Sequence, residues 1–127
     1  MQIYVCVTCR VEGELAEPKE QRSGARLHAA LRARAQGAVD IVPVECLSVC
    51  KKPCTVSFAA PGKWTYVYGD LLPGISEDII LAGARLYDAA PDGVIAWKQR
   101  PDALKKGVVA RIPPLPAPVP KTEETAA

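Results

Sequence analysis

Long apolar runs are missing from this chain of 127 residues. No stretch approaches the roughly 20 apolar residues that a membrane-spanning helix requires. The N-terminus, MQIYVCVTCR, also lacks the basic lead and the long apolar run of a secretion signal. We therefore expect a cytoplasmic protein that does not bind membranes.

Concentrated positive charge and a recognisable catalytic residue set are missing too. Sixteen Lys and Arg stand against fourteen Asp and Glu, and the basic residues are scattered instead of forming a stripe interleaved with aromatics. Nucleic-acid binding is therefore not expected, because its electrostatic footprint is absent. The chain has a single histidine, His28, and no Ser-His-Asp set, phosphate-binding loop or pair of carboxylates beside a pocket. These absences argue against an enzyme.

Cysteine, in contrast, is clustered. Cys6 and Cys9 form a C-x-x-C pair, and Cys46, Cys50 and Cys54 recur at every fourth residue. Structural disulfides are unexpected in a reducing compartment, and an odd number of cysteines fits paired bridges poorly. Thiolate sulfur favours zinc, copper(I) and iron-sulfur clusters, and four cysteines complete either a tetrahedral zinc site or a [2Fe-2S] cluster. Ligand type alone does not choose between these two.

The periodicity of apolar residues predicts an α/β domain. In order, the expected elements are a strand over residues 2–8, a helix between Ser23 and Gly37, a strand over residues 39–44, a hairpin with strands over residues 55–59 and 64–68, and a helix between Ser76 and Pro91. A strand-helix-strand unit followed by a hairpin and a helix is the thioredoxin-like arrangement, with a mixed four-stranded sheet.

The expected domain covers residues 1–112. Five prolines between Pro113 and Pro120 forbid regular structure there, so residues 113–127 are expected to form a flexible, proline-rich tail. Both cysteine clusters follow strand ends, which can meet at one edge of the sheet.

A thioredoxin-like fold also admits a redox-active dithiol made by Cys6 and Cys9. A catalytic C-x-x-C gains its low thiolate pKa largely from a helix N-terminus. The expected helix start at Ser23 lies well downstream of Cys9 in the sequence. Sequence position therefore disfavours a thiol-disulfide oxidoreductase.

The segment CLSVCKKPCTVSFAAPGKWTYVYGDL resembles the cluster-binding half of thioredoxin-like [2Fe-2S] ferredoxins. Its matching residues are Cys46, Cys50, Pro53, Val56, Pro61, Gly62, Trp64 and Tyr66. The opening IYVC also resembles the first strand of that family, which ends in its first ligand, so the resemblance implies Cys6 as a ligand. The family places its second ligand roughly a dozen residues later, where this chain has no cysteine.

Cys9 is the only cysteine on that side that can replace the missing ligand. Together with the stretch WKQRPDALKKGVVARIPP, this C-x-x-C variant resembles a bacterial family of predicted metal-binding proteins that is often associated with cobalamin metabolism. The resemblance implies a [2Fe-2S] cluster held by Cys6, Cys9, Cys46 and Cys50. Cys54 falls where the ferredoxins have a non-ligand residue, and we expect it to be a small buried side chain, with a role as alternative ligand left open.

The sequence therefore predicts a one-electron carrier that exchanges electrons with a protein partner, in a reductive step of cobalamin metabolism. A zinc or soft-metal delivery protein that uses the same cysteines is the alternative, and a thiol-disulfide oxidoreductase is the second alternative.

Arg10, Lys51 and Lys52 are sequence neighbours of the ligands, and they either stabilise an anionic cluster or are solvated surface residues. A homodimer through a sheet edge is compatible with the pattern.

Overall fold

The computed structural model describes residues 1–117. Its elements are β1 (Gln2–Cys6), α1 (Ser23–Ala35), β2 (Asp40–Val44), β3 (Val56–Ala59), β4 (Thr65–Tyr68), α2 (Glu77–Ala89), α3 (Asp102–Lys106) and β5 (Val108–Ile112), with short 3-10 turns over Lys19–Gln21 and Trp97–Gln99. Residues 113–117 form neither helix nor strand. The expected flexible tail over residues 113–127 otherwise lies outside the described residues.

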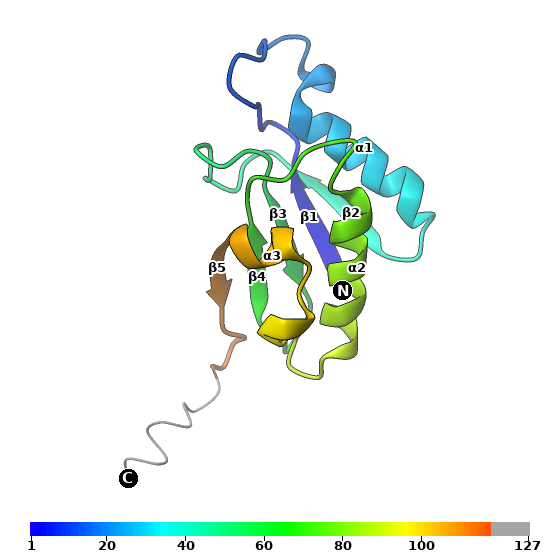
Figure 1. The fold of residues 1–127 in the computed structure, drawn as a ribbon, viewed down its shortest axis with the longest axis vertical. Coiled ribbons are helices and arrows are strands. Elements are labelled where there is room, and N and C mark those ends of the chain that lie inside the picture. Colours follow the sequence, from blue (N-terminus) through cyan, green and yellow to red (C-terminus); the bar gives the residue numbers. More distant parts are fainter. Residues whose placement is uncertain (118–127) are drawn as a thin grey trace.

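The strands form one mixed sheet in the order β2-β1-β3-β4-β5 (Figure 1). β1 is parallel to β2, and the other neighbouring strands are antiparallel. The expected α/β order is present, but the expectation of four strands is wrong, because β5 adds a fifth. β5 is an edge strand whose residues are mostly exposed, so its sequence lacks the apolar alternation that would have predicted it.

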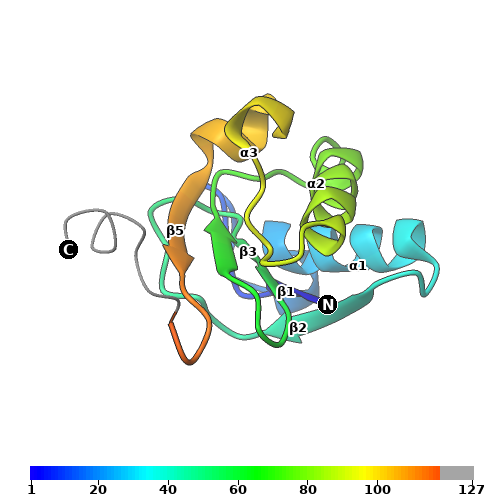
Figure 2. The same cartoon turned by 90° about the horizontal axis from the view of Figure 1, so that it is seen from below.

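The helices gather over one face of the sheet, as Figure 2 shows. Amphipathic helices bury their apolar stripe in this way. Leu27 and Leu31 of α1 are fully buried, as are Ile80 and Tyr87 of α2. An aromatic cluster completes this core, in which the ring of Phe58 lies 5.2 Å from that of Tyr68 and the rings of Tyr66 and Tyr68 stack at 5.5 Å.

The parallel pairing of β1 and β2 positions the cysteines. Cys6, the last residue of β1, is paired with Val44, the last residue of β2. The segment after β1 and the loop between β2 and β3 therefore start from the same end of the sheet. Together with Cys6 at the end of β1, these two segments carry all five cysteines of the chain.

Candidate metal centre

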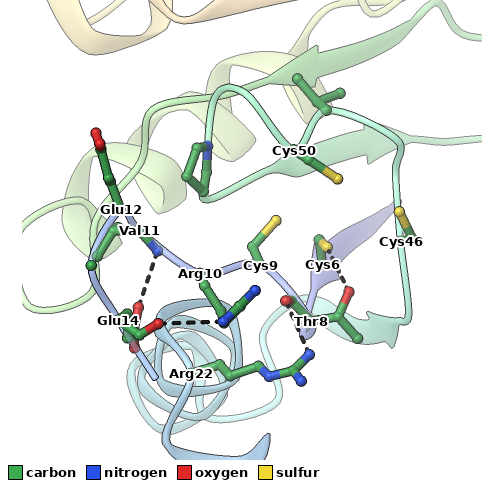
Figure 3. Close-up of a pocket in the computed structure, with 13 residues that line it drawn as sticks. Cys6, Thr8, Cys9, Arg10, Val11, Glu12, Glu14, Arg22, Cys46 and Cys50 are labelled. Carbon is green, nitrogen blue, oxygen red and sulfur yellow. Dashed lines mark hydrogen bonds between the residues drawn. The ribbon is translucent and has the colours of Figure 1, made fainter. Parts of the chain in front are cut away.

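Four cysteine side chains line one cavity of about 450 Å³ at this end of the sheet. Cys6 and Cys9 come from β1 and the turn after it, and Cys46 and Cys50 come from the β2–β3 loop. Figure 3 shows the two pairs facing each other across the cavity. The structure thus brings together the four cysteines that the sequence singled out, although the first pair and the second pair lie far apart in the sequence, on either side of α1 and β2.

The start of helix α1 packs directly against the first cysteine pair. The Gly24 amide donates a hydrogen bond to the Cys9 carbonyl at 3.0 Å. A Cβ atom on Gly24 would lie 2.0 Å from the Cys6 carbonyl oxygen and 3.2 Å from the Cys9 Cβ. Only glycine allows this approach, which places a helix N-terminus beside the C-x-x-C pair. The distance in sequence between Cys9 and Ser23 counts against a redox dithiol. In the fold the helix start lies next to the pair, so this objection does not hold.

The thiols of Cys6 and Cys9 have opposite pKa shifts. A hydrogen bond from Cys9 lowers the pKa of Cys6 to about 5, helped by hydrogen bonds from Thr8 and Leu47 and opposed by burial. The same bond, burial and the neighbouring Cys6 thiolate raise the pKa of Cys9 well above its usual range. One thiolate is thus stabilised in this pair, which is the protonation state that a metal ligand or a nucleophile needs.

The second pair lies on a more exposed loop. Both Cys46 and Cys50 are exposed. The Ser48 amide donates a hydrogen bond to the Cys46 sulfur at 3.2 Å. Ser48 adopts a left-handed backbone conformation with a φ of 61°, which is unfavourable for a residue other than glycine. The loop therefore holds an amide donor on a sulfur atom at a conformational cost, an arrangement that suits a metal-bound thiolate.

Two arginines, and neither of the expected lysines, line the cavity. Arg10 and Arg22 belong to its wall, whereas Lys51 and Lys52 do not and are exposed. The side chain of Arg22 is only 14% exposed. It donates hydrogen bonds to the carbonyl oxygens of Ala16 at 2.7 Å and Thr8 at 3.3 Å. Arg22 went unnoticed in the sequence because the loop and helix packing that bring it to the cavity leave no local pattern.

The fifth cysteine lies behind the cavity wall. Cys54 is fully buried and is not among the lining residues. Its amide donates to the Leu71 carbonyl at 2.9 Å, and burial raises its pKa to about 12. Cys54 therefore has the surroundings of a small buried side chain.

Cysteine geometry bears on the kind of metal group. Within residues 1–117, no three His, Cys, Asp or Glu side chains converge closely enough to share one metal ion. A structural zinc ion needs four ligands around a single point. A [2Fe-2S] cluster is larger and takes its four thiolates around two irons. The cavity presents its four sulfurs as two pairs on opposite sides, and Glu12 and Glu14 line it as well.

Glu14 ties the loop after β1 to helix α1. Its carboxylate accepts hydrogen bonds from the Val11 amide at 3.0 Å, from Arg26 at 3.2 Å and from the Ser23 hydroxyl. Burial alone would raise the pKa of Glu14, but these bonds outweigh it and lower the pKa below its ordinary value of 4.5. The charged form therefore stabilises the fold above that pH, and this contribution is lost as the pH falls through the folded-state pKa.

Substituting Glu14→Gln should therefore lower the free energy of unfolding by about 1–2 kcal/mol at neutral pH. The difference from the wild type should shrink as the pH falls below 4.5, since the wild-type carboxyl then becomes neutral as well. Urea denaturation at several pH values measures both effects. A difference that stays constant down to pH ~3 would show that the carboxylate charge is not responsible.

Comparison with known proteins now identifies the family. The profile of a family described as "Protein of unknown function (DUF1636)" matches residues 3–114. The chain belongs to the DUF1636 family. A search of curated proteins found no match. The family description assigns no activity, so the association with cobalamin metabolism stays a prediction.

A solved structure with the same fold is the thioredoxin-like [2Fe-2S] ferredoxin from Aquifex aeolicus. It matches this DUF1636 chain with a TM-score of 0.54 at 19% sequence identity, and the match covers 87% of this chain and 90% of that one. At this identity the similarity establishes the fold and not the function. The thioredoxin-like fold expected from the sequence is confirmed. Among the described residues, no helix is long and apolar enough to span a membrane.

Proposed function

We propose that this protein is a one-electron carrier whose [2Fe-2S] cluster is held by Cys6, Cys9, Cys46 and Cys50. The observation that supports it best is the single cavity lined by two pairs of thiols, one from each side. The ferredoxin with the same fold, which by its name carries a [2Fe-2S] cluster, adds support from a relative.

Several groups around the cavity suit an anionic group, although Glu12 and Glu14 also line it. A cluster with four thiolates is anionic and gains negative charge on reduction, so cations and amide donors stabilise it. Arg22 supplies a nearly buried cation, the Ser48 amide bonds to the Cys46 sulfur, and the N-terminus of α1 lies against Cys9. These groups would hold the charge in place, while the bound cluster supplies the electron transfer. Nothing in this arrangement requires a catalytic residue.

A second candidate function, thiol-disulfide exchange, is favoured by one observation. Cys6 has a pKa lowered to about 5, as the attacking thiol of an oxidoreductase requires, and its backbone carbonyl lies against Gly24 at the start of α1. In this case Cys6 and Cys9 would alternate between dithiol and disulfide, passing two electrons and two protons to a partner disulfide or receiving them from a partner dithiol. Cys46 and Cys50 would then have no redox role, which makes this the weaker proposal.

Metal content distinguishes these functions. Protein prepared anaerobically should be brown, contain about two irons per chain and show an electron paramagnetic resonance signal once reduced. Colourless protein with about one zinc ion per chain would show that the cysteines bind a soft metal ion and not a cluster. Metal-free protein that forms a reversible Cys6–Cys9 disulfide would instead support the second candidate. Protein prepared in air, which exposes the cluster to oxidation, serves as the control.

The cellular role is part of the same proposal. We place the protein in the cytoplasm, where thiols stay reduced, with a protein as its redox partner. A reductive step of cobalamin metabolism is the role that the sequence resemblance suggests.

A further inference from the structure

Positive charge is concentrated in one segment of the chain, which runs from the 3-10 turn Trp97–Gln99 through α3 to the edge strand β5. The segment 97–111 carries five Lys or Arg and a single Asp, and Lys51 and Lys52 follow Cys50 directly. We call this set, residues 97–111 with Lys51 and Lys52, the basic strip. The whole chain has a net charge of only +2, so the remainder of the chain is net negative. Five of these seven cations lie in one stretch of the sequence, and the fold adds Lys51 and Lys52 to them.

The two parts of the basic strip meet at Gly69. Its amide donates to the Gly107 carbonyl at 2.8 Å, and the Asp70 amide donates to the Lys52 carbonyl at 2.9 Å. A Cβ atom on Gly69 would lie 2.7 Å from the Lys52 Cβ and 3.4 Å from the side chain of Val109. In both views the β2–β3 loop lies on the same side of the molecule as β5 (Figures 1 and 2). The strip therefore extends from the cysteine loop along the edge of the sheet.

Aromatic rings hold several of these cations in place. The guanidinium of Arg100 lies 5.3 Å from the ring centres of both Tyr66 and Trp97, and that of Arg111 lies 4.4 Å from Trp64. Arg100 also donates to the Ile95 carbonyl at 3.0 Å. Such fixed cations lose little conformational freedom on binding. Trp97 is itself 59% exposed, as a binding residue at the centre of a protein interface would be before docking.

Within residues 97–111 little negative charge neutralises the strip, although the exposed Asp70 lies at the junction with Lys52. Among the described residues, its one internal ion pair joins Lys105 to Asp102 at 3.8 Å, and Asp102 is 90% exposed. Positive charge on one face attracts and orients a partner with complementary negative charge. We propose that the basic strip is the docking surface for an acidic face of the partner protein, with Trp97 as its apolar anchor. This inference rests on the proposed function, because it names the partner of the same site.

Binding of a defined acidic polymer tests the strip. We would titrate the purified protein, metal-loaded and metal-free, with poly-L-glutamate of about 20 residues by calorimetry at low salt, and repeat it near 0.2 M salt. Binding should weaken steeply with salt. The double variant Lys98→Glu/Lys106→Glu should bind about tenfold more weakly or worse, because both side chains are exposed strip cations. Trp97→Ala should weaken the binding that remains at high salt.

A matched control variant distinguishes the effect of the basic strip on binding from the effect of the protein's net charge. Arg32→Glu/Arg85→Glu alters two exposed cations on α1 and α2, outside the strip, by the same total charge. It should bind nearly as well as the wild type. Equal weakening in both variants, or tighter binding of a single-stranded oligonucleotide of matched charge, would overturn the proposal. If the protein acquires no cluster even when prepared anaerobically but still binds the polymer, the strip is supported, and the missing cluster alone refutes the electron-carrier function.

Discussion

Replacing Gly24 with alanine should destabilise the protein by about 3 kcal/mol and prevent the metal centre from forming. The new Cβ would lie 2.0 Å from the Cys6 carbonyl oxygen, and this neighbour is backbone at the end of the interior strand β1. Helix α1 would have to withdraw, and the hydrogen bond from the Gly24 amide to Cys9 would break with it. Urea denaturation and metal content of the same preparation measure both losses.

Gly83 in helix α2 provides the matched control for this prediction. A Cβ there would lie 2.2 Å from a methyl group of Leu104, which is the movable end of a side chain, and 3.4 Å from Phe58. Alanine also forms helix better than glycine by about 1 kcal/mol. Gly83→Ala should therefore cost far less than Gly24→Ala. Similar losses in both variants would mean that the contact with Cys6 has no special weight.

Replacing any one of Cys6, Cys9, Cys46 or Cys50 with serine should reduce the bound iron from about two atoms per chain to a small fraction of that amount. A hydroxyl is a poor substitute for a soft thiolate ligand, and a cluster that lacks one ligand is exposed at that position to solvent. Visible absorption and iron content of anaerobic preparations measure the loss. The spectrum of any residual cluster should also be shifted.

Cys54→Ala is the control for the four serine variants. Cys54 is fully buried behind the cavity, so alanine should retain the iron and lower the free energy of unfolding by about 1 kcal/mol. Loss of iron from Cys54→Ala together with its retention in Cys9→Ser would reverse our ligand assignment. In that case Cys54, and not Cys9, would be the fourth ligand beside Cys6, Cys46 and Cys50.

The order of elements could be predicted because each depends on local pattern. The alternation that became β1, the apolar stripe of α1 and the hairpin of β3 and β4 are all visible within a few residues. β5 and α3 could not be predicted. Five residues of α3 are too few for a periodic signal, and β5 is an exposed edge strand held by its pairing with β4.

By itself, the sequence determined the donor chemistry of the site, because sulfur ligands and their short spacings are properties of the local chain. Tertiary structure alone decided which groups surround those sulfurs. Arg22 lines the cavity and Gly24 packs against Cys6 and Cys9 only because α1 connects β1 to a parallel β2 with its N-terminus beside the cysteines. Lys51 and Lys52 follow Cys50 in the sequence but do not line the cavity. Which residues meet at this end of the sheet depends on how the elements pack and not on distance along the chain.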